Sequence, residues 1–172
     1  GLVSGLGLGV AGCKSKQDAK LQGVDVTGAE YANDFPLPDA DGKQRSIQDF
    51  AGKVTVVFFG YTQCPDVCPT TLQELVEVKQ LLGADGDKLQ GIFISVDPER
   101  DTPEVLKAYV GNFDPSMVAL TGTPEQIAAV AKDFKVFFRK VDGKVPGAYT
   151  VDHTAGIYMF DPQGRLRAYH RY

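Results

Sequence analysis

The sequence has little basic character and few side chains that bind soft metals. Its formal net charge is −4, its pI is about 5.1, and no basic run is longer than two residues. It therefore lacks an electrostatic footprint for nucleic acid. Only two histidines and three cysteines occur among 172 residues, and no internal repeat or low-complexity segment is present. With 43% apolar residues, a chain of this length can form one domain with a sizeable core.

The first residues resemble the end of an export signal. Residues 1–12 are uncharged and too few to span a bilayer. Residues 10–13 resemble a bacterial lipobox, in which the cysteine becomes the acylated first residue of a lipoprotein. We therefore expect residues 1–12 to be the remnant of a lipoprotein signal peptide and Cys13 to carry the lipid. The alternative is a stray thiol that follows an ordinary signal peptide.

The expected anchor defines the domains and the compartment. Residues 13–29 are polar and lack apolar periodicity, which is typical of a flexible linker. We expect a lipid-anchored linker at 13–29 and one folded domain at 30–172. The protein would then be an exported, membrane-anchored lipoprotein of a bacterial cell envelope, facing the periplasm or the cell exterior. An oxidising compartment would permit a disulfide between the two remaining cysteines.

The folded part alternates strand and helix patterns. The continuous apolar run 54–61 is rich in β-branched and aromatic residues, as in a strand buried on both faces. A second such run lies at 91–97, and helical periodicity follows each of them. This alternation predicts an α/β sandwich with parallel crossovers. The expected helices are 69–82, 102–112 and 123–134; the other strands are 35–37, 117–120, 136–141, 156–161 and 165–169; 46–50 forms a helical turn, and 39–42 and 162–164 are turns.

Two cysteines follow the first buried strand and precede a helix. A strand-to-helix junction in an open α/β sheet is where ligands collect, and a helix N-terminus stabilises a thiolate. Pro69 has no backbone N–H, so we expect it to be the first residue of the regular helix. Cys64 and Cys68 would then both lie at the helix N-terminus.

The spacing of the two cysteines permits two kinds of chemistry. Residues four apart have Cα atoms about 6 Å apart in a helix, within the range of roughly 4.4 to 6.8 Å that a disulfide needs. When reduced, Cys64 and Cys68 could hold one soft metal ion. One more residue than in the Cys-x-x-Cys of thioredoxins widens the pair, which favours metal binding over fast dithiol exchange. A structural disulfide is disfavoured because so short a loop gains little from closure.

A histidine and an acidic residue complete the candidate site. His153 lies at the entrance to the strand expected at 156–160. Taken alone, such a histidine is more often structural, but two thiolates with one imidazole make a soft three-coordinate site that favours copper. Zinc would more often take a fourth protein ligand or a water. Asp97 follows the second buried strand, so it is either an outer group near the metal or an ordinary turn residue.

Three separated motifs resemble those of the Sco/SenC family: FFGYTQCPDVCPTTL, SVDPERDTPEVLKAYV and VDHTAGIYMFDPQG. The resemblance covers roughly residues 30–172. It implies a thioredoxin-like sandwich, with a central mixed sheet flanked by helices, an N-terminal extension and a C-terminal hairpin. It also implies one copper ion, Cu(I) or Cu(II), bound by Cys64, Cys68 and His153. Asp97 matches an acidic position near that site.

The family resemblance also implies a function with two versions. The first is a metallochaperone without turnover that delivers copper to the binuclear copper site of cytochrome c oxidase during assembly. Its partners would be the oxidase copper-site subunit and a periplasmic copper donor or thiol reductant. The second is a membrane-tethered thiol-disulfide oxidoreductase, with Cys64 and Cys68 as the catalytic pair, that keeps the oxidase cysteines reduced. A peroxidase is disfavoured because a cysteine pair replaces the single peroxidatic cysteine.

Two features depart from the family pattern. Many members are anchored by a transmembrane helix, whereas this chain is expected to use Cys13. The family fold usually adds a closing helix after the last strand, so we expect the domain to continue past Tyr172.

Overall fold

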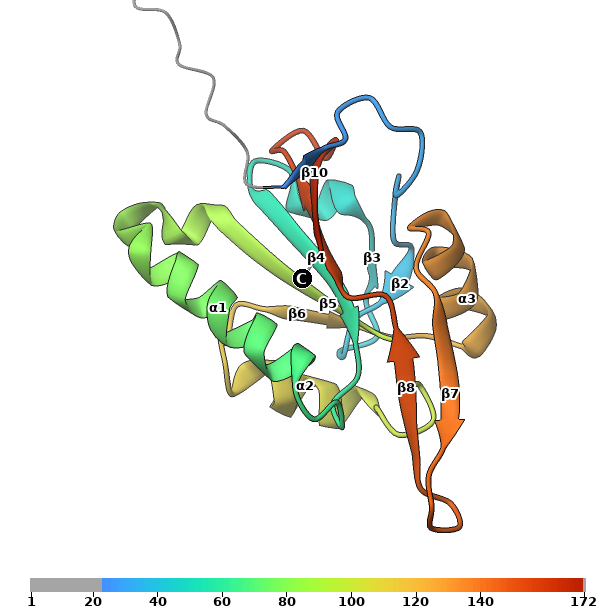
Figure 1. The fold of residues 1–172 in the computed structure, drawn as a ribbon. Helices are drawn as coiled ribbons and strands as arrows, with labels where there is room; N and C mark the ends of the chain where they lie inside the picture. Colours follow the sequence, from blue (N-terminus) through green and yellow to red (C-terminus); the bar gives the residue numbers. More distant parts are fainter. Residues whose placement is uncertain (1–22, 172) are drawn as a thin grey trace, which may run out of the picture.

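The computed structural model describes residues 23–171, which form a mixed sheet covered by helices (Figure 1). The six strands of this sheet follow the order β1-β10-β9-β4-β5-β6. The β4 to β6 strands are parallel, and β9, β10 and β1 join antiparallel to their neighbours. Their bounds are β1 (Val24–Asp25), β4 (Val54–Gly60), β5 (Leu89–Ser95), β6 (Val118–Leu120), β9 (Gly156–Phe160) and β10 (Leu166–Arg171).

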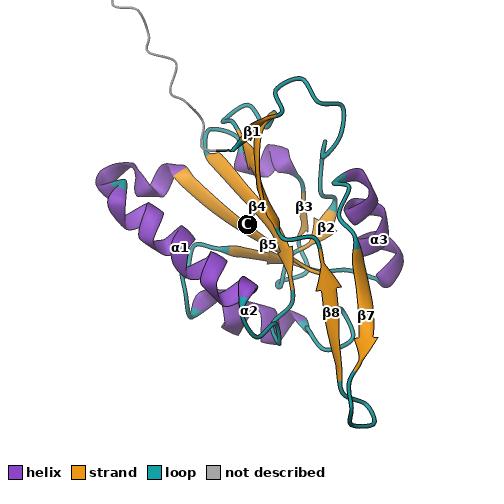
Figure 2. Ribbon diagram, in the orientation of Figure 1, coloured by secondary structure: helices purple, strands orange, loops and turns teal. Residues whose placement is uncertain are grey.

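Helices cover both faces of the sheet, as Figures 1 and 2 show. Residues of α1 (Val67–Leu81) and α2 (Pro103–Gly111) belong to one core cluster. Residues of α3 (Pro124–Asp133) and of the 3₁₀ helix η1 (Ile47–Phe50) belong to the other. A second 3₁₀ helix, η2 (Gly83–Lys88), follows α1. The predicted α/β sandwich is therefore confirmed.

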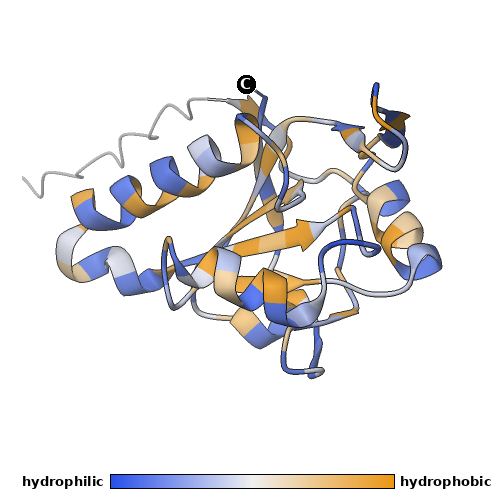
Figure 3. Ribbon diagram, turned by 90° about the horizontal axis from the view of Figure 1, so that it is seen from below, coloured by the Kyte–Doolittle hydropathy of each residue, from blue (hydrophilic) through white to orange (hydrophobic). Residues whose placement is uncertain are grey.

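The central strand β4 separates the two cores. Val57 and Phe59 pack in the cluster under α3, whereas Phe58 packs in the cluster under α1 and α2. This alternation follows from the period of two along a strand. Because both faces are covered, the strand reads as one apolar run. Figure 3 shows the same pattern, with apolar strands between helices that carry hydrophilic stripes.

Two of the three α-helices begin where the sequence predicts, and the third begins earlier. Thr102 caps α2, with its side chain accepting from Val105 N at 3.3 Å, and Thr123 forms a capping box on α3. α1 begins at Val67, so the expectation that Pro69 is its first residue is wrong. The first backbone N–H groups of a helix have no intrahelical acceptor, so a proline is tolerated at the third position as well.

A separate hairpin projects from the sheet (Figure 1). It consists of β7 (Phe138–Asp142) and β8 (Tyr149–His153), which pair antiparallel with each other. The sequence predicted a strand near β7 but not β8. His153 lies just before β9, as expected, and is also the last residue of the unpredicted β8, where it pairs with Phe138.

The N-terminal part of the described chain is more ordered than expected. In the segment predicted as a flexible linker, β1 pairs with β10, and Val26 N donates to Arg167 O at 3.1 Å. Further on, β2 (Leu37–Pro38) and β3 (Gln44–Arg45) form a small two-stranded sheet of their own. Cys13 and the rest of the lipobox-like stretch lie outside the described residues. Within residues 23–171, every helix is too short or too polar to cross a membrane.

Candidate metal centre

The two cysteines lie where β4 passes into α1. Cys64 occupies the turn between them, and its backbone N–H donates to Tyr61 O at 3.2 Å. Cys68 is the second residue of α1 and is 1% exposed, while Cys64 is half-buried. Both are free thiols in the described chain. Both sulfurs therefore lie at the junction that the sequence indicated.

His153 reaches this junction from the end of β8. Its Nε2 lies 3.7 Å from Cys68 Sγ, and the two sulfurs and one ring nitrogen all lie within 4.8 Å of one another. The other ring nitrogen, Nδ1, lies 3.2 Å from Thr154 O. A carbonyl oxygen can only accept, so the contact with Thr154 needs a proton on Nδ1, while Nε2 faces the sulfurs. The fold thus brings together the three residues that the sequence singled out.

The two thiols are not equivalent. The pKa of Cys64 is lowered to about 4, mainly because the Cys68 side chain donates to its sulfur, with backbone N–H groups of Cys68 and Asp66 and the His153 ring adding to this. The pKa of Cys68 is raised, because its proton is held by Cys64 and because the side chain is buried. One thiolate and one thiol share the site at neutral pH.

A glycine makes room for the buried sulfur. A Cβ built on Gly60, the last residue of β4, would lie 2.5 Å from Cys68 Sγ and 2.8 Å from a ring carbon of Phe93. Real Cβ atoms do not approach other atoms this closely. The backbone of β4 therefore approaches the cysteine in a way that requires glycine.

A buried carboxylate fixes the start of the cysteine turn. Asp101 is 1% exposed and accepts from Thr62 N at 3.0 Å, Thr62 Oγ1 at 2.6 Å and Ser95 Oγ at 2.7 Å. It therefore ties the turn to the end of β5. Sequence reasoning missed Asp101, although its place in the charged loop beside Asp97 was a signal that could have found it.

Asp97 lies near the site but does not contact the three candidate ligands. It is 4% exposed, accepts from Arg100 Nε at 2.5 Å, and accepts from the Tyr149 hydroxyl at 2.7 Å. The Arg100 guanidinium lies over the ring of Tyr61 at 5.7 Å. The Tyr61 ring in turn meets the His153 ring at 6.0 Å between centroids. Asp97 is thus connected to the site through other side chains, and sequence reasoning missed Arg100, Tyr61 and Tyr149.

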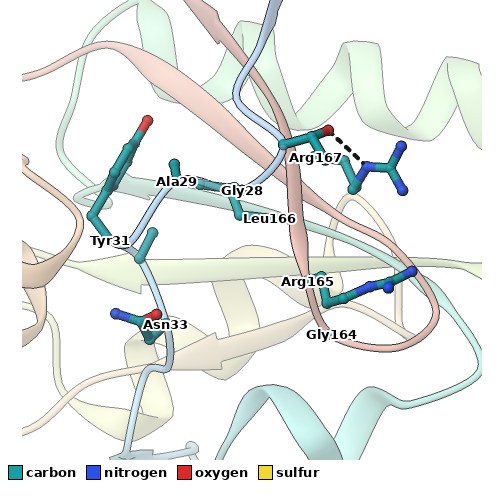
Figure 4. A pocket seen from close by; sticks show the side chains of 10 residues that line it. Gly28, Ala29, Tyr31, Asn33, Gly164, Arg165, Leu166 and Arg167 are labelled. Atoms are coloured by element: carbon teal, nitrogen blue, oxygen red, sulfur yellow. Dashed lines mark hydrogen bonds between the residues drawn. The ribbon is translucent and has the colours of Figure 1, made fainter.

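A cavity of about 420 Å³ lies between the N-terminal segment and β10 (Figure 4). None of the three candidate ligands lines it. Its two arginines, Arg165 and Arg167, both approach Asp161, and Arg167 Nε also donates to Thr27 Oγ1 at 2.9 Å. The cavity is therefore separate from the cysteine and histidine cluster.

The model of the SCO1/SenC family matches residues 25–172. The chain belongs to the SCO1/SenC family. Among the family's proteins, the "SCO2-like protein" of Rickettsia felis is 38% identical over 137 residues, covering 79% of this chain and 67% of that protein. The mitochondrial protein SCO2 of Saccharomyces cerevisiae is 41% identical over 134 residues, covering 77% of this chain and 44% of that protein. The chain spans less than half of the yeast relative.

Solved structures of SCO1/SenC proteins share the fold. Bradyrhizobium japonicum ScoI with copper bound is 49% identical, with a TM-score of 0.73 over 79% of this chain and 86% of that one. A SCO1/SenC family lipoprotein from Bacillus anthracis is 29% identical, with a TM-score of 0.67 over 80% and 82%. BsSco, described as a member of the Sco family of cytochrome c oxidase assembly proteins with a disulfide switch, is 27% identical, with a TM-score of 0.63 over 87% and 88%.

These similarities confirm the predicted fold, a thioredoxin-like sandwich with a mixed central sheet flanked by helices. They also bear on the cluster at the end of β4. Cys64, Cys68 and His153 could form a copper site, because their donor atoms are close together and a similar SCO1/SenC structure has copper bound.

Proposed function

We propose that this chain binds one copper ion through Cys64 Sγ, Cys68 Sγ and His153 Nε2, and delivers it to the binuclear copper site of cytochrome c oxidase during assembly. The observation that carries the proposal is the convergence of these three donor atoms within 4.8 Å. The copper-bound relative and the relative described as an oxidase assembly protein support it. Its partners are the oxidase copper-site subunit and a periplasmic copper donor.

The donor set selects the kind of metal. Two sulfurs and one imidazole are soft donors, which suit copper better than oxygen-seeking ions. In residues 23–171, no fourth His, Cys, Asp or Glu joins this group. A structural zinc site would more often have a fourth protein ligand. One side of the ion is thus left for a donor from a partner, which suits transfer better than storage.

Metal analysis and electron paramagnetic resonance of the reduced protein, loaded with copper, test the site. The wild type should hold one copper per chain, and Cys64→Ser, Cys68→Ser and His153→Ala should each lose or weaken it. His170→Ala is the matched control, since that histidine lies in β10 outside the cluster. Full retention of copper affinity in His153→Ala would contradict a site of three ligands.

The lowered pKa of Cys64 favours a second function, a thiol-disulfide oxidoreductase that keeps the oxidase copper-site cysteines reduced. The Cys64 thiolate would attack the substrate disulfide, forming a mixed disulfide and releasing one substrate thiolate. Cys68 would then lose its proton and attack Cys64 Sγ, which releases the second substrate thiolate and leaves a Cys64–Cys68 disulfide for a thiol reductant to reopen. Exchange with a disulfide substrate should survive His153→Ala and vanish in either Cys→Ser variant. A wild type that shows no exchange would contradict this second function.

We also propose that the protein is exported and held at a bacterial membrane by lipid on Cys13, with the residues between Cys13 and β1 as the tether. The lipobox-like residues 10–13 and the similar B. anthracis lipoprotein support this. Expressed with its own export signal, the wild type should incorporate a labelled fatty acid and sediment with membranes. Cys13→Ser should do neither, and a membrane-bound Cys13→Ser protein would contradict lipid anchoring.

A further inference from the structure

We propose that Arg100 is a positioning residue that holds the β7–β8 hairpin against the cysteine turn and so keeps His153 within reach of the two sulfurs. It acts with Asp97, Tyr149 and Tyr61; these four side chains are called the hairpin latch. The proposal rests on the proposed copper site for its effect on metal affinity. Its effect on the metal-free protein does not depend on that site.

The hairpin needs such a latch because it has little backbone support. In the described chain β7 and β8 pair only with each other, as a sheet of two strands. Hairpins of two strands are marginally stable alone in water. His153 sits at the end of β8, so the position of its ring depends on how the hairpin is held.

The Arg100 guanidinium joins three segments at one point. Its Nε pairs with Asp97 at 2.5 Å in the loop after β5. Its Nη1 donates to Tyr149 O at 3.0 Å, at the first residue of β8, and to Gln63 Oε1 at 3.2 Å, next to Cys64. The planar guanidinium can do this because it presents several donors in fixed directions, which a lysine cannot.

Tyr149 is held on several sides. The Arg100 guanidinium lies 3.5 Å from its ring centroid and Lys140 Nζ lies 3.9 Å from it. Its hydroxyl donates to the buried Asp97 carboxylate at 2.7 Å. Cation–π contacts and a hydrogen bond to a buried charge are each stronger where water is excluded. The start of β8 is thus fixed to the β5 loop.

Tyr61 connects the latch to the candidate ligands. Its ring lies nearly perpendicular to that of His153, at 87°, and is 3% exposed. Its carbonyl accepts the Cys64 N–H. Tyr61 therefore contacts both the strand that brings the imidazole and the turn that carries the first sulfur. Arg100, over the Tyr61 ring, completes the link between them.

Loss of Arg100 should release the hairpin rather than remove a ligand. Without its partner, the Asp97 carboxylate would be left buried and unpaired, which costs stability at that point. The fraction of molecules with His153 near the sulfurs would fall, and apparent metal affinity falls with the fraction that is competent to bind. The loss of metal affinity caused by removing Arg100 should therefore depend on the presence of His153.

A double-mutant cycle on copper affinity tests this route. Arg100→Met should weaken Cu(I) binding, measured by competition with a chromophoric chelator, by on the order of tenfold. In a His153→Ala background the same change should alter affinity less than about twofold. Equal weakening in both backgrounds would overturn the proposal, since Arg100 would then act on the thiols or on overall stability. Tyr149→Phe removes only the hydroxyl that donates to Asp97, so it disturbs the fold less. It should show the same pattern more weakly.

Hydrogen exchange of the metal-free protein tests the latch without copper. Arg100→Met and Tyr149→Phe should speed exchange of the β8 amides and leave those of β9 and β10 unchanged. Arg165→Met is the matched control. That arginine also pairs with an aspartate, Asp161, but in the turn between β9 and β10. If β8 exchanges at the wild-type rate in Tyr149→Phe and Arg100→Met, the latch does not exist, whether or not the protein binds copper.

Discussion

At the scale of single residues, the site is asymmetric. Cys64 is half-buried and its sulfur accepts hydrogen bonds, whereas Cys68 is buried and keeps its proton. In the proposed exchange, the more exposed Cys64 would therefore attack first, and the buried Cys68 would follow. This order suits both proposed functions, because a partner's metal or disulfide meets Cys64 first.

The lowered pKa of Cys64 predicts a pH profile. In the reduced, metal-free protein its alkylation rate should stay nearly level as pH falls from about 8 to about 5, and drop only near its pKa of about 4. In Cys68→Ala the main lowering cause is lost, so the pKa should rise and the rate at about pH 6 should fall. Mass spectrometry of the alkylated protein measures both. A profile identical in the two proteins would rule out Cys68 as the cause.

At the scale of elements, the site depends on a close approach between β4 and α1. Gly60 ends the strand and Cys68 is the second residue of the helix, with no room for a methyl group between them. Helix α1 therefore packs closer to the sheet than any residue with a side chain at position 60 would permit. This contact between Gly60 and Cys68, rather than the helix N-terminus by itself, determines how deeply Cys68 Sγ is buried.

Gly60→Ala should disturb that contact. Overpacking by a methyl group in a close-packed core costs about 1–3 kcal/mol of unfolding free energy. Displacing Cys68 should also raise the pKa of Cys64, since its main hydrogen-bond donor moves away. Denaturant unfolding and the alkylation profile report the two effects. Gly111→Ala is the control, because nothing lies within 4 Å of a Cβ there. It should leave the pKa of Cys64 unchanged and should not lower the unfolding free energy, since alanine is the better helix former at the end of α2.

At the scale of the whole molecule, the candidate ligands come from two units that the sheet does not join. The cysteine turn belongs to the main sheet and α1, while His153 belongs to the separate hairpin. A bound ion would therefore link the hairpin to the main body. Metal binding and global stability should be coupled for this reason.

Copper should raise the unfolding temperature of the reduced protein. Free copper at a hundredfold excess over its Kd stabilises the folded state by about 2.7 kcal/mol. His153→Ala should show a smaller rise and Cys64→Ser little or none, as differential scanning calorimetry can measure. A rise of the same size in Cys64→Ser would mean that copper binds elsewhere in the chain.

The sequence alone identified most of the strands and helices of the main sheet and the three candidate ligands. The buried strands at 54–61 and 91–97, the threonine caps and the position of the cysteines were readable because they are local patterns of hydrophobicity, capping and turns. The motifs that resemble the Sco/SenC family singled out His153 across 85 residues from Cys68, a pairing that no local pattern indicates.

Only the tertiary structure decided how His153 reaches the sulfurs. The β8 strand was not predicted, because its first residue, Tyr149, is held by Arg100 and Asp97 from another part of the chain and the strand has no periodic apolar pattern. Asp97, by sequence either an outer group near the metal or a turn residue, accepts hydrogen bonds from Arg100 and Tyr149. Residue types and their order determined which groups could meet. The distance between them depends on contacts between segments far apart in the chain, and those contacts form only when the chain has folded.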